Sequence, residues 1–128
     1  MSKLKKVVLG LAIAGSVFSA NALADVTSRT AYLTGDAPKA ESSNMAIVSK
    51  IKVVGKATTP YTGLTAAGYK NIAFLPDTKH ASVFVPAGST RTASESVSNS
   101  SYYARATAEI SPDGQYYYST GTSTISNY

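Results

Sequence analysis

The chain has 128 residues, no cysteine, one histidine and a formal charge of +5 at neutral pH. This length allows one small domain, and the absence of cysteine excludes disulfides and cysteine-ligated metal centres. The seven carboxylates are dispersed and lack the spacing of a calcium loop, so the sequence predicts no metal site and no cofactor.

Residues 1–24 have the pattern of a Sec-type signal peptide. Lys3, Lys5 and Lys6 precede an apolar run over residues 7–18, and Ala22-Leu23-Ala24 matches a cleavage site. The run is shorter than the roughly 20 residues that a membrane-spanning helix needs. We therefore expect export through the inner membrane, cleavage, and a single domain over residues 25–128 without a membrane span. The expected location is the periplasm, the cell surface or the medium.

The segment after the leader has a composition typical of strands. Serine and threonine dominate it, and tyrosine outnumbers phenylalanine and tryptophan together. Leucine is scarce, and the five prolines fall where apolar alternation stops. We predict an all-β fold, a small antiparallel β-sandwich or sheet of about six or seven strands. Loss of the three leader lysines lowers the formal charge from +5 to +2, which does not favour a nucleic-acid partner.

The first two predicted strands cover residues 26–34 and 45–58, with a turn over residues 35–38 between them. Side chains on a strand alternate between its two faces. In the second strand this places four residues on one face: Ile47, Ser49, Ile51 and Val53. The opposite face carries Val48, Val54 and a basic stripe of Lys50, Lys52 and Lys56.

The middle of the chain has weaker signals. Residues 60–70 show no clean period and are predicted to form a long loop or one helical turn. Short strands are predicted at residues 71–75 and 79–85, each ended by a proline. The serine-rich residues 89–101 predict a solvated edge strand or a mobile loop.

The clearest local signal is the sequence Ser111-Pro112-Asp113-Gly114, which has the chemistry of a type I turn. Closing a hairpin at this turn pairs Ile110 with Tyr116. Continuing the same register pairs Ala108 with Tyr118, Ala106 with Thr120 and Ala104 with Thr122. The face that carries Tyr102, the alanines, Tyr116 and Tyr118 is predicted to be buried. Tyr103 and Tyr117 are then predicted to face outward.

Resemblances to catalytic motifs fail on their context. Ser49 and Lys52 have the spacing of a Ser-x-x-Lys pair, but in a strand a spacing of three places the two side chains on opposite faces. Residues 63–68 resemble the start of a phosphate-binding loop, but the lysine that must follow its second glycine is absent. Asp77 and His80 are close enough in sequence to form a surface pair. We therefore expect a protein that is not an enzyme.

Exposed tyrosines offer apolar area and a hydroxyl at low entropic cost, which suits contact with protein or glycan. The candidate binding surface consists of Tyr103, Tyr117, Lys50, Lys52 and Lys56. The favoured interpretation is a binding or cell-surface interaction module. The alternatives are a fimbria-like or surface-polymer subunit that self-associates by strand exchange, and a small secreted toxin or inhibitor.

Overall fold

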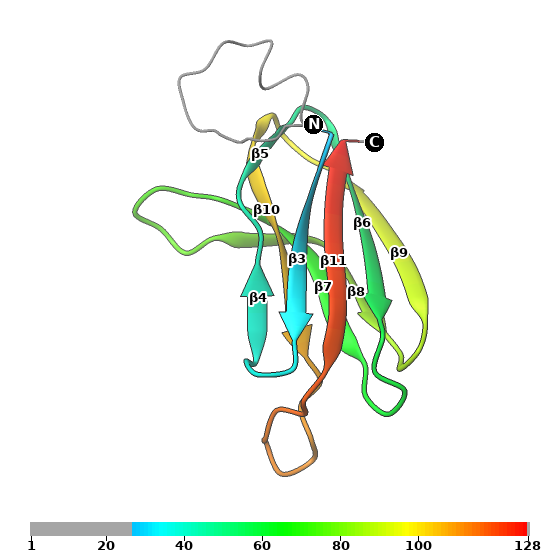
Figure 1. The fold of residues 1–128 in the computed structure, drawn as a ribbon. Coiled ribbons are helices and arrows are strands. Elements are labelled where there is room, and N and C mark those ends of the chain that lie inside the picture. The colour runs from blue at the N-terminus through cyan, green and yellow to red at the C-terminus, as the bar shows by residue number, and fades with distance from the viewer. Residues whose placement is uncertain (1–26, 128) are drawn as a thin grey trace, which may run out of the picture.

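The computed structural model describes residues 27–127, and the predicted leader lies outside them. The described chain forms nine strands and no helix, arranged as two antiparallel sheets that pack face to face (Figure 1). The prediction of a small all-β sandwich is therefore confirmed. The strands are β3 (Ser28–Thr34), β4 (Lys39–Glu41), β5 (Met45–Ile47), β6 (Lys50–Ala57), β7 (Leu64–Lys70), β8 (Thr78–Val85), β9 (Thr90–Ser96), β10 (Ser100–Ala108) and β11 (Thr120–Asn127).

One sheet, which we call the β11 sheet, has the order β3-β11-β6-β9. The other, the β10 sheet, has the order β4-β10-β7-β8, and the short strand β5 also pairs with β10. The serine-rich segment forms β9, an edge strand with mostly exposed side chains, which agrees with the first of its two predicted forms.

The predicted single strand over residues 45–58 is wrong, because the chain changes sheets within it. β5 pairs with β10, whereas β6 pairs with β11 and β9. The side chain of Asn127 holds the crossing: its carbonyl accepts from Val48 N at 3.3 Å and its amide donates to Ala46 O at 3.2 Å. Both strands bury alternate residues, so the apolar pattern continues through a bend that joins different sheets.

The predicted loop over residues 60–70 is also wrong at its second half, since residues 64–70 form β7 in the middle of the β10 sheet. Two of its inward residues, Ala66 and Gly68, are small, so the segment has little apolar contrast for periodicity to detect. The strand predicted at residues 71–75 does not form; these residues belong to the loop between β7 and β8. The strand predicted at 79–85 agrees with β8.

The predicted hairpin at residues 111–114 is confirmed only at its turn. Ile110 and Tyr116 form an isolated bridge, but β10 and β11 then separate into different sheets. Ala106 pairs with Ala66 of β7 rather than with Thr120, which itself pairs with Thr34 of β3. The loop between the strands is long enough for the chain to cross from one sheet to the other.

The core lies between the two sheets and is thin. Ile51, Val53 and Ile125 of the β11 sheet are fully buried against the β10 sheet. The largest inward residues opposite them are also fully buried: Ile47, Leu64, Val85 and Tyr102. Ala104 and Ala106 are also fully buried, which confirms the prediction for the alanine face. The sheets approach closely at Gly55, where a Cβ atom would lie 2.5 Å from both Ala66 Cβ and Val85 Cγ2.

Candidate functional site

Four connections gather at one end of the sandwich, at the bottom of Figure 1. They are residues 35–38, 58–63, 86–89 and 109–119. Two of them are tied together by side chains. Glu109 accepts a hydrogen bond from Gly63 N at 2.7 Å, and Ser119 Oγ donates to Thr62 Oγ1 at 3.1 Å. We call this end of the sandwich, with its four connections, the loop end.

The connection over residues 109–119 has a defined internal structure. Ser111 O accepts from Gly114 N at 2.9 Å, and Ser111 N donates to Gln115 O at 2.7 Å. Gly114 has a φ of +87°, a conformation that glycine adopts without steric cost. Hydrogen bonds from Ser111 and from the Gln115 amide hold the pKa of Asp113 below its usual range. The turn that the sequence predicts therefore shapes the loop end.

Four exposed tyrosines lie on the connections of the loop end. Tyr61 and Tyr118 are 88% and 82% exposed, Tyr116 is 48% exposed and Tyr117 is 37% exposed. Tyr117 is exposed, as predicted, but Tyr116 and Tyr118, which the predicted register placed on the buried alanine face, are more exposed than Tyr117, so that part of the prediction is wrong. The register does not continue past Tyr116, because the chain crosses there to the other sheet. A cleft of about 220 Å³ lies between the turn at residues 36–38 and residues 115–118. Tyr61 follows Pro60 in the segment predicted as a loop, a signal that could have identified it as a fourth surface tyrosine.

The prediction that Tyr103 is exposed is wrong. It lies on the outer face of β10, but neighbouring groups cover it and only 7% of its surface is accessible. Tyr69 of β7 stacks beside it with 5.7 Å between ring centroids. Its hydroxyl donates to Asp77 Oδ2 at 2.6 Å. Burial and the bond to Asp77 raise the pKa of Tyr103 to about 12.

Arg105 completes this cluster. Its guanidinium lies 3.9 Å from the centroid of the Tyr69 ring and forms an ion pair of 2.6 Å with Glu41 of β4. Next to it is a shallow polar pocket of about 230 Å³, lined by Glu41, Ser42, Asn44, Asn71, Asp77 and Tyr103. Both carboxylates of the pocket already accept hydrogen bonds from the protein, Glu41 from Arg105 and Asp77 from Tyr103.

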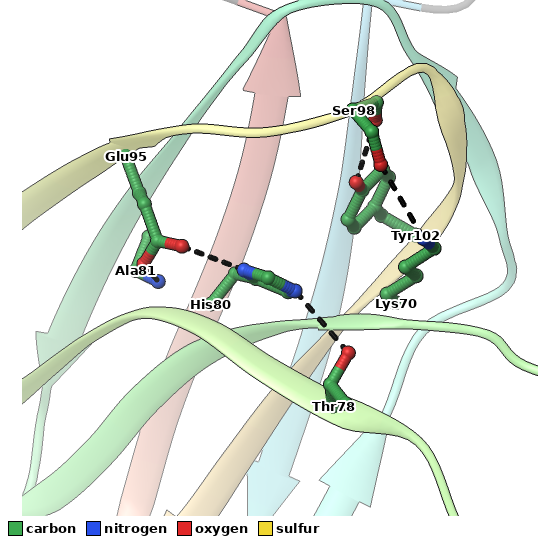
Figure 2. Close-up of polar contacts among 7 residues, drawn as sticks. All are labelled: Lys70, Thr78, His80, Ala81, Glu95, Ser98 and Tyr102. Atoms are coloured by element: carbon green, nitrogen blue, oxygen red, sulfur yellow. Dashed lines mark hydrogen bonds and ion pairs between the residues drawn. The ribbon is translucent and has the colours of Figure 1, made fainter. Parts of the chain in front are cut away.

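The surface pair suggested for Asp77 and His80 does not form. Asp77 accepts from Ile72 N at 2.9 Å, and this bond, followed by the one from Tyr103, lowers its pKa. His80 instead lies between Thr78 and Glu95, as Figure 2 shows. Its Nδ1 is 2.6 Å from Glu95 Oε2.

Glu95 connects the edges of the two sheets. It is on β9, whereas the groups that bind its carboxylate, the His80 ring and the Ala81 amide, are on β8. Ala81 interrupts the regular register of β8 and has a φ of +49°. The bonds from His80 and then Ala81 lower the pKa of Glu95. This arrangement favours a structural role for the only histidine in the sequence.

The predicted basic stripe lies on the outer face of β6. Register places Lys52 between Ser126 of β11 and Ser94 of β9, and Lys56 between Thr122 and Thr90. The outward positions on the four strands of the β11 sheet carry three lysines, one valine, one tyrosine and otherwise serine or threonine. This face has no acidic residue at those positions.

The five predicted binding residues therefore do not form one surface. Tyr117 lies at the loop end, Tyr103 is buried beside Tyr69 and Asp77 on the β10 sheet, and the three lysines lie on the β11 sheet. Within residues 27–127, the loop end is the part that combines several exposed aromatic rings with a cleft.

Among residues 27–127 there is no group of three or more histidine or carboxylate side chains placed to hold a metal ion. The same residues include no helix long and apolar enough to cross a membrane. No protein-family model and no curated protein sequence matches the chain. The fold and the site together define a small β-sandwich with a tyrosine-rich loop end.

Proposed function

We propose that the protein is an exported, non-enzymatic binding module whose loop end contacts a glycan or a protein at the cell surface. The observation that carries this proposal is the group of four exposed tyrosines, Tyr61 and residues 116–118, at one end of the sandwich. Loops held by a β-sandwich are a common location for binding sites, because the sheets position them without taking part in recognition.

The chemistry of the cleft supports this role. Tyr116 and Tyr118 supply apolar ring faces and hydroxyls, while Asp36 and Gln115 on its lining add a carboxylate and an amide. Sugars and peptide surfaces both present apolar patches beside hydrogen-bonding groups, so a cleft with this mixture complements them. The hydrogen bonds within residues 109–119 reduce the ordering cost on binding.

Strand exchange, the alternative role, has less support. The N-terminal strand β3 is paired with β11 of the same chain over seven residues. Donation of β3 to a neighbouring subunit would first break that pairing. No feature of the described residues favours a toxin or an inhibitor.

The test is binding of purified protein to a glycan array and to isolated cell envelopes. The variant Tyr116→Ser/Tyr118→Ser is compared with Tyr32→Thr, which changes a tyrosine that is 66% exposed on β3. We expect the double variant to lose about tenfold or more in affinity, the effect of removing central aromatic contacts. The Tyr32→Thr variant should bind like the parent. Equal loss in both variants, or no binding by the parent in either assay, would refute the proposal.

A further inference from the structure

The loop between β7 and β8 carries an unusual apolar surface. Figure 1 shows this connection extending away from the sandwich, to the left. It contains five consecutive apolar residues, Ile72-Ala73-Phe74-Leu75-Pro76, of which the last four are exposed. Phe74 is fully exposed and Leu75 is 66% exposed. Exposed runs of this kind are uncommon on soluble proteins and indicate contact with another surface.

The loop is held in place at its base. Asn71 N donates to Ser101 O at 2.9 Å, and Asp77 accepts from both Ile72 N and the Tyr103 hydroxyl. The tip is backbone-strained, because Phe74 has a φ of +65°, where bulky residues are rarely found. Strain of this kind persists where the surrounding structure enforces it, and it is concentrated at functional sites.

Two lysines stand at the base of the loop. Lys70 ends β7, and Lys79 lies near the start of β8, paired with Tyr69. The single carboxylate between them in sequence, Asp77, is already hydrogen-bonded to the protein. Lys79 is on the same face of the sheet as Tyr69, whereas Lys70 is on the opposite face, where its Nζ donates to Ser98 Oγ at 3.3 Å. The loop therefore presents an apolar tip with the cation of Lys79 at its base.

We propose that residues 71–77 form a peripheral anchor that inserts Phe74 and Leu75 into the surface of an anionic lipid bilayer. Apolar side chains are stable at the boundary between head groups and acyl chains, and nearby lysines are attracted to anionic lipids. Lysine stems also extend along an apolar surface while the ammonium group reaches the head groups. The anchor is separate from the tyrosine-rich loop end, so an experiment can refute membrane binding by the anchor without refuting ligand binding at the loop end, and the reverse.

The absence of tryptophan from the chain permits a direct test. Phe74→Trp places a single indole at the tip, and Phe84→Trp places one on the outer face of β8 as a matched control, at a position 50% exposed. Each variant is mixed with vesicles of phosphatidylcholine alone or with added phosphatidylglycerol. For Phe74→Trp we expect a blue shift of the indole emission with anionic vesicles only, weakened by salt, and for the control no shift.

Two substitutions in the Phe74→Trp background refine the test. Lys79→Ser should weaken vesicle binding about fivefold, the effect of removing one lysine near an anionic surface. Tyr116→Ser/Tyr118→Ser should leave it unchanged, which distinguishes the anchor from the proposed ligand site. The proposal is overturned if anionic vesicles cause no shift or if neutral vesicles cause the same shift. It is also overturned if the tip instead mediates a concentration-dependent dimer that Leu75→Ser abolishes.

Discussion

The distance between the two sheets depends on Gly55, and the substitution Gly55→Ala tests this directly. The added Cβ would lie 2.5 Å from Ala66 Cβ and from Val85 Cγ2, about 1 Å closer than an optimal carbon–carbon contact. Gly55 and Ala66 are on strands that are hydrogen-bonded to a neighbour on each side, and Val85 is fully buried on β8. The backbone at Gly55 or Ala66 therefore cannot shift without moving the neighbouring strands.

The expected cost follows from two opposing terms. Inserting a methyl group into a packed core costs about 1–3 kcal/mol. Replacing glycine by alanine within a strand recovers about 0.5–1 kcal/mol of backbone entropy. We therefore expect Gly55→Ala to lower the free energy of unfolding by about 1–2 kcal/mol, measured by urea denaturation followed by tyrosine fluorescence and circular dichroism.

A double-mutant cycle shows whether the contact with Ala66 is responsible. Ala66→Gly alone should destabilise the protein, because it removes a buried methyl group and adds a flexible residue. Added to Gly55→Ala, it should cost about 1 kcal/mol less than it does alone, since it relieves one of the two overlaps. Ser94→Ala, an exposed change on β9, serves as the control. Unchanged stability of Gly55→Ala, or additive effects within about 0.5 kcal/mol, would refute the reasoning.

Three further predictions concern single residues. Gly121→Ala should lower the urea midpoint of unfolding more than Gly68→Ala does. A Cβ at position 121 would lie 2.1 Å from the backbone oxygen of Lys56, whereas a Cβ at position 68 would lie 2.4 Å from Ile51 Cδ1, the end of a flexible side chain. Tyr103 should be among the last tyrosines to ionise in an absorbance titration. Because its pKa rises from 10.0 to about 12 on folding, its contribution to the free energy of unfolding is lost as the pH rises from 10 to 12. Tyr103→Phe should reduce that loss. Folding lowers the pKa of Glu95 from its usual value of 4.5, so its contribution to the free energy of unfolding is present above pH 4.5 and is lost as the pH falls below 4.5. Glu95→Gln should therefore be less stable than the parent at pH 6 and approach it in acid, and identical thermal midpoints at pH 6 would contradict this.

Part of the candidate site was predictable from sequence. The type I turn at residues 111–114 followed from local chemistry, because turn residues act over four positions. The exposure of the adjacent tyrosines did not follow from it, because the predicted register placed Tyr116 and Tyr118 on the buried face, whereas the chain crosses there to the other sheet and both are exposed. Tyr103 was not predictable in the same way. Alternation placed it correctly on the outer face of β10, but its burial depends on Tyr69 and Asp77, which come from β7 and the following loop.

The sequence by itself determined the all-β class, the buried face of β10 and the inward positions of β6, because period-two alternation specifies which face a side chain occupies. Only the tertiary structure decided which strands are neighbours. Alternation is identical for any antiparallel partner, so it could not show that β5 and β6, or β10 and β11, lie in different sheets. The central strand β7 escaped detection because its inward residues Ala66 and Gly68 are small, and the sheets need small residues at these two positions to approach each other.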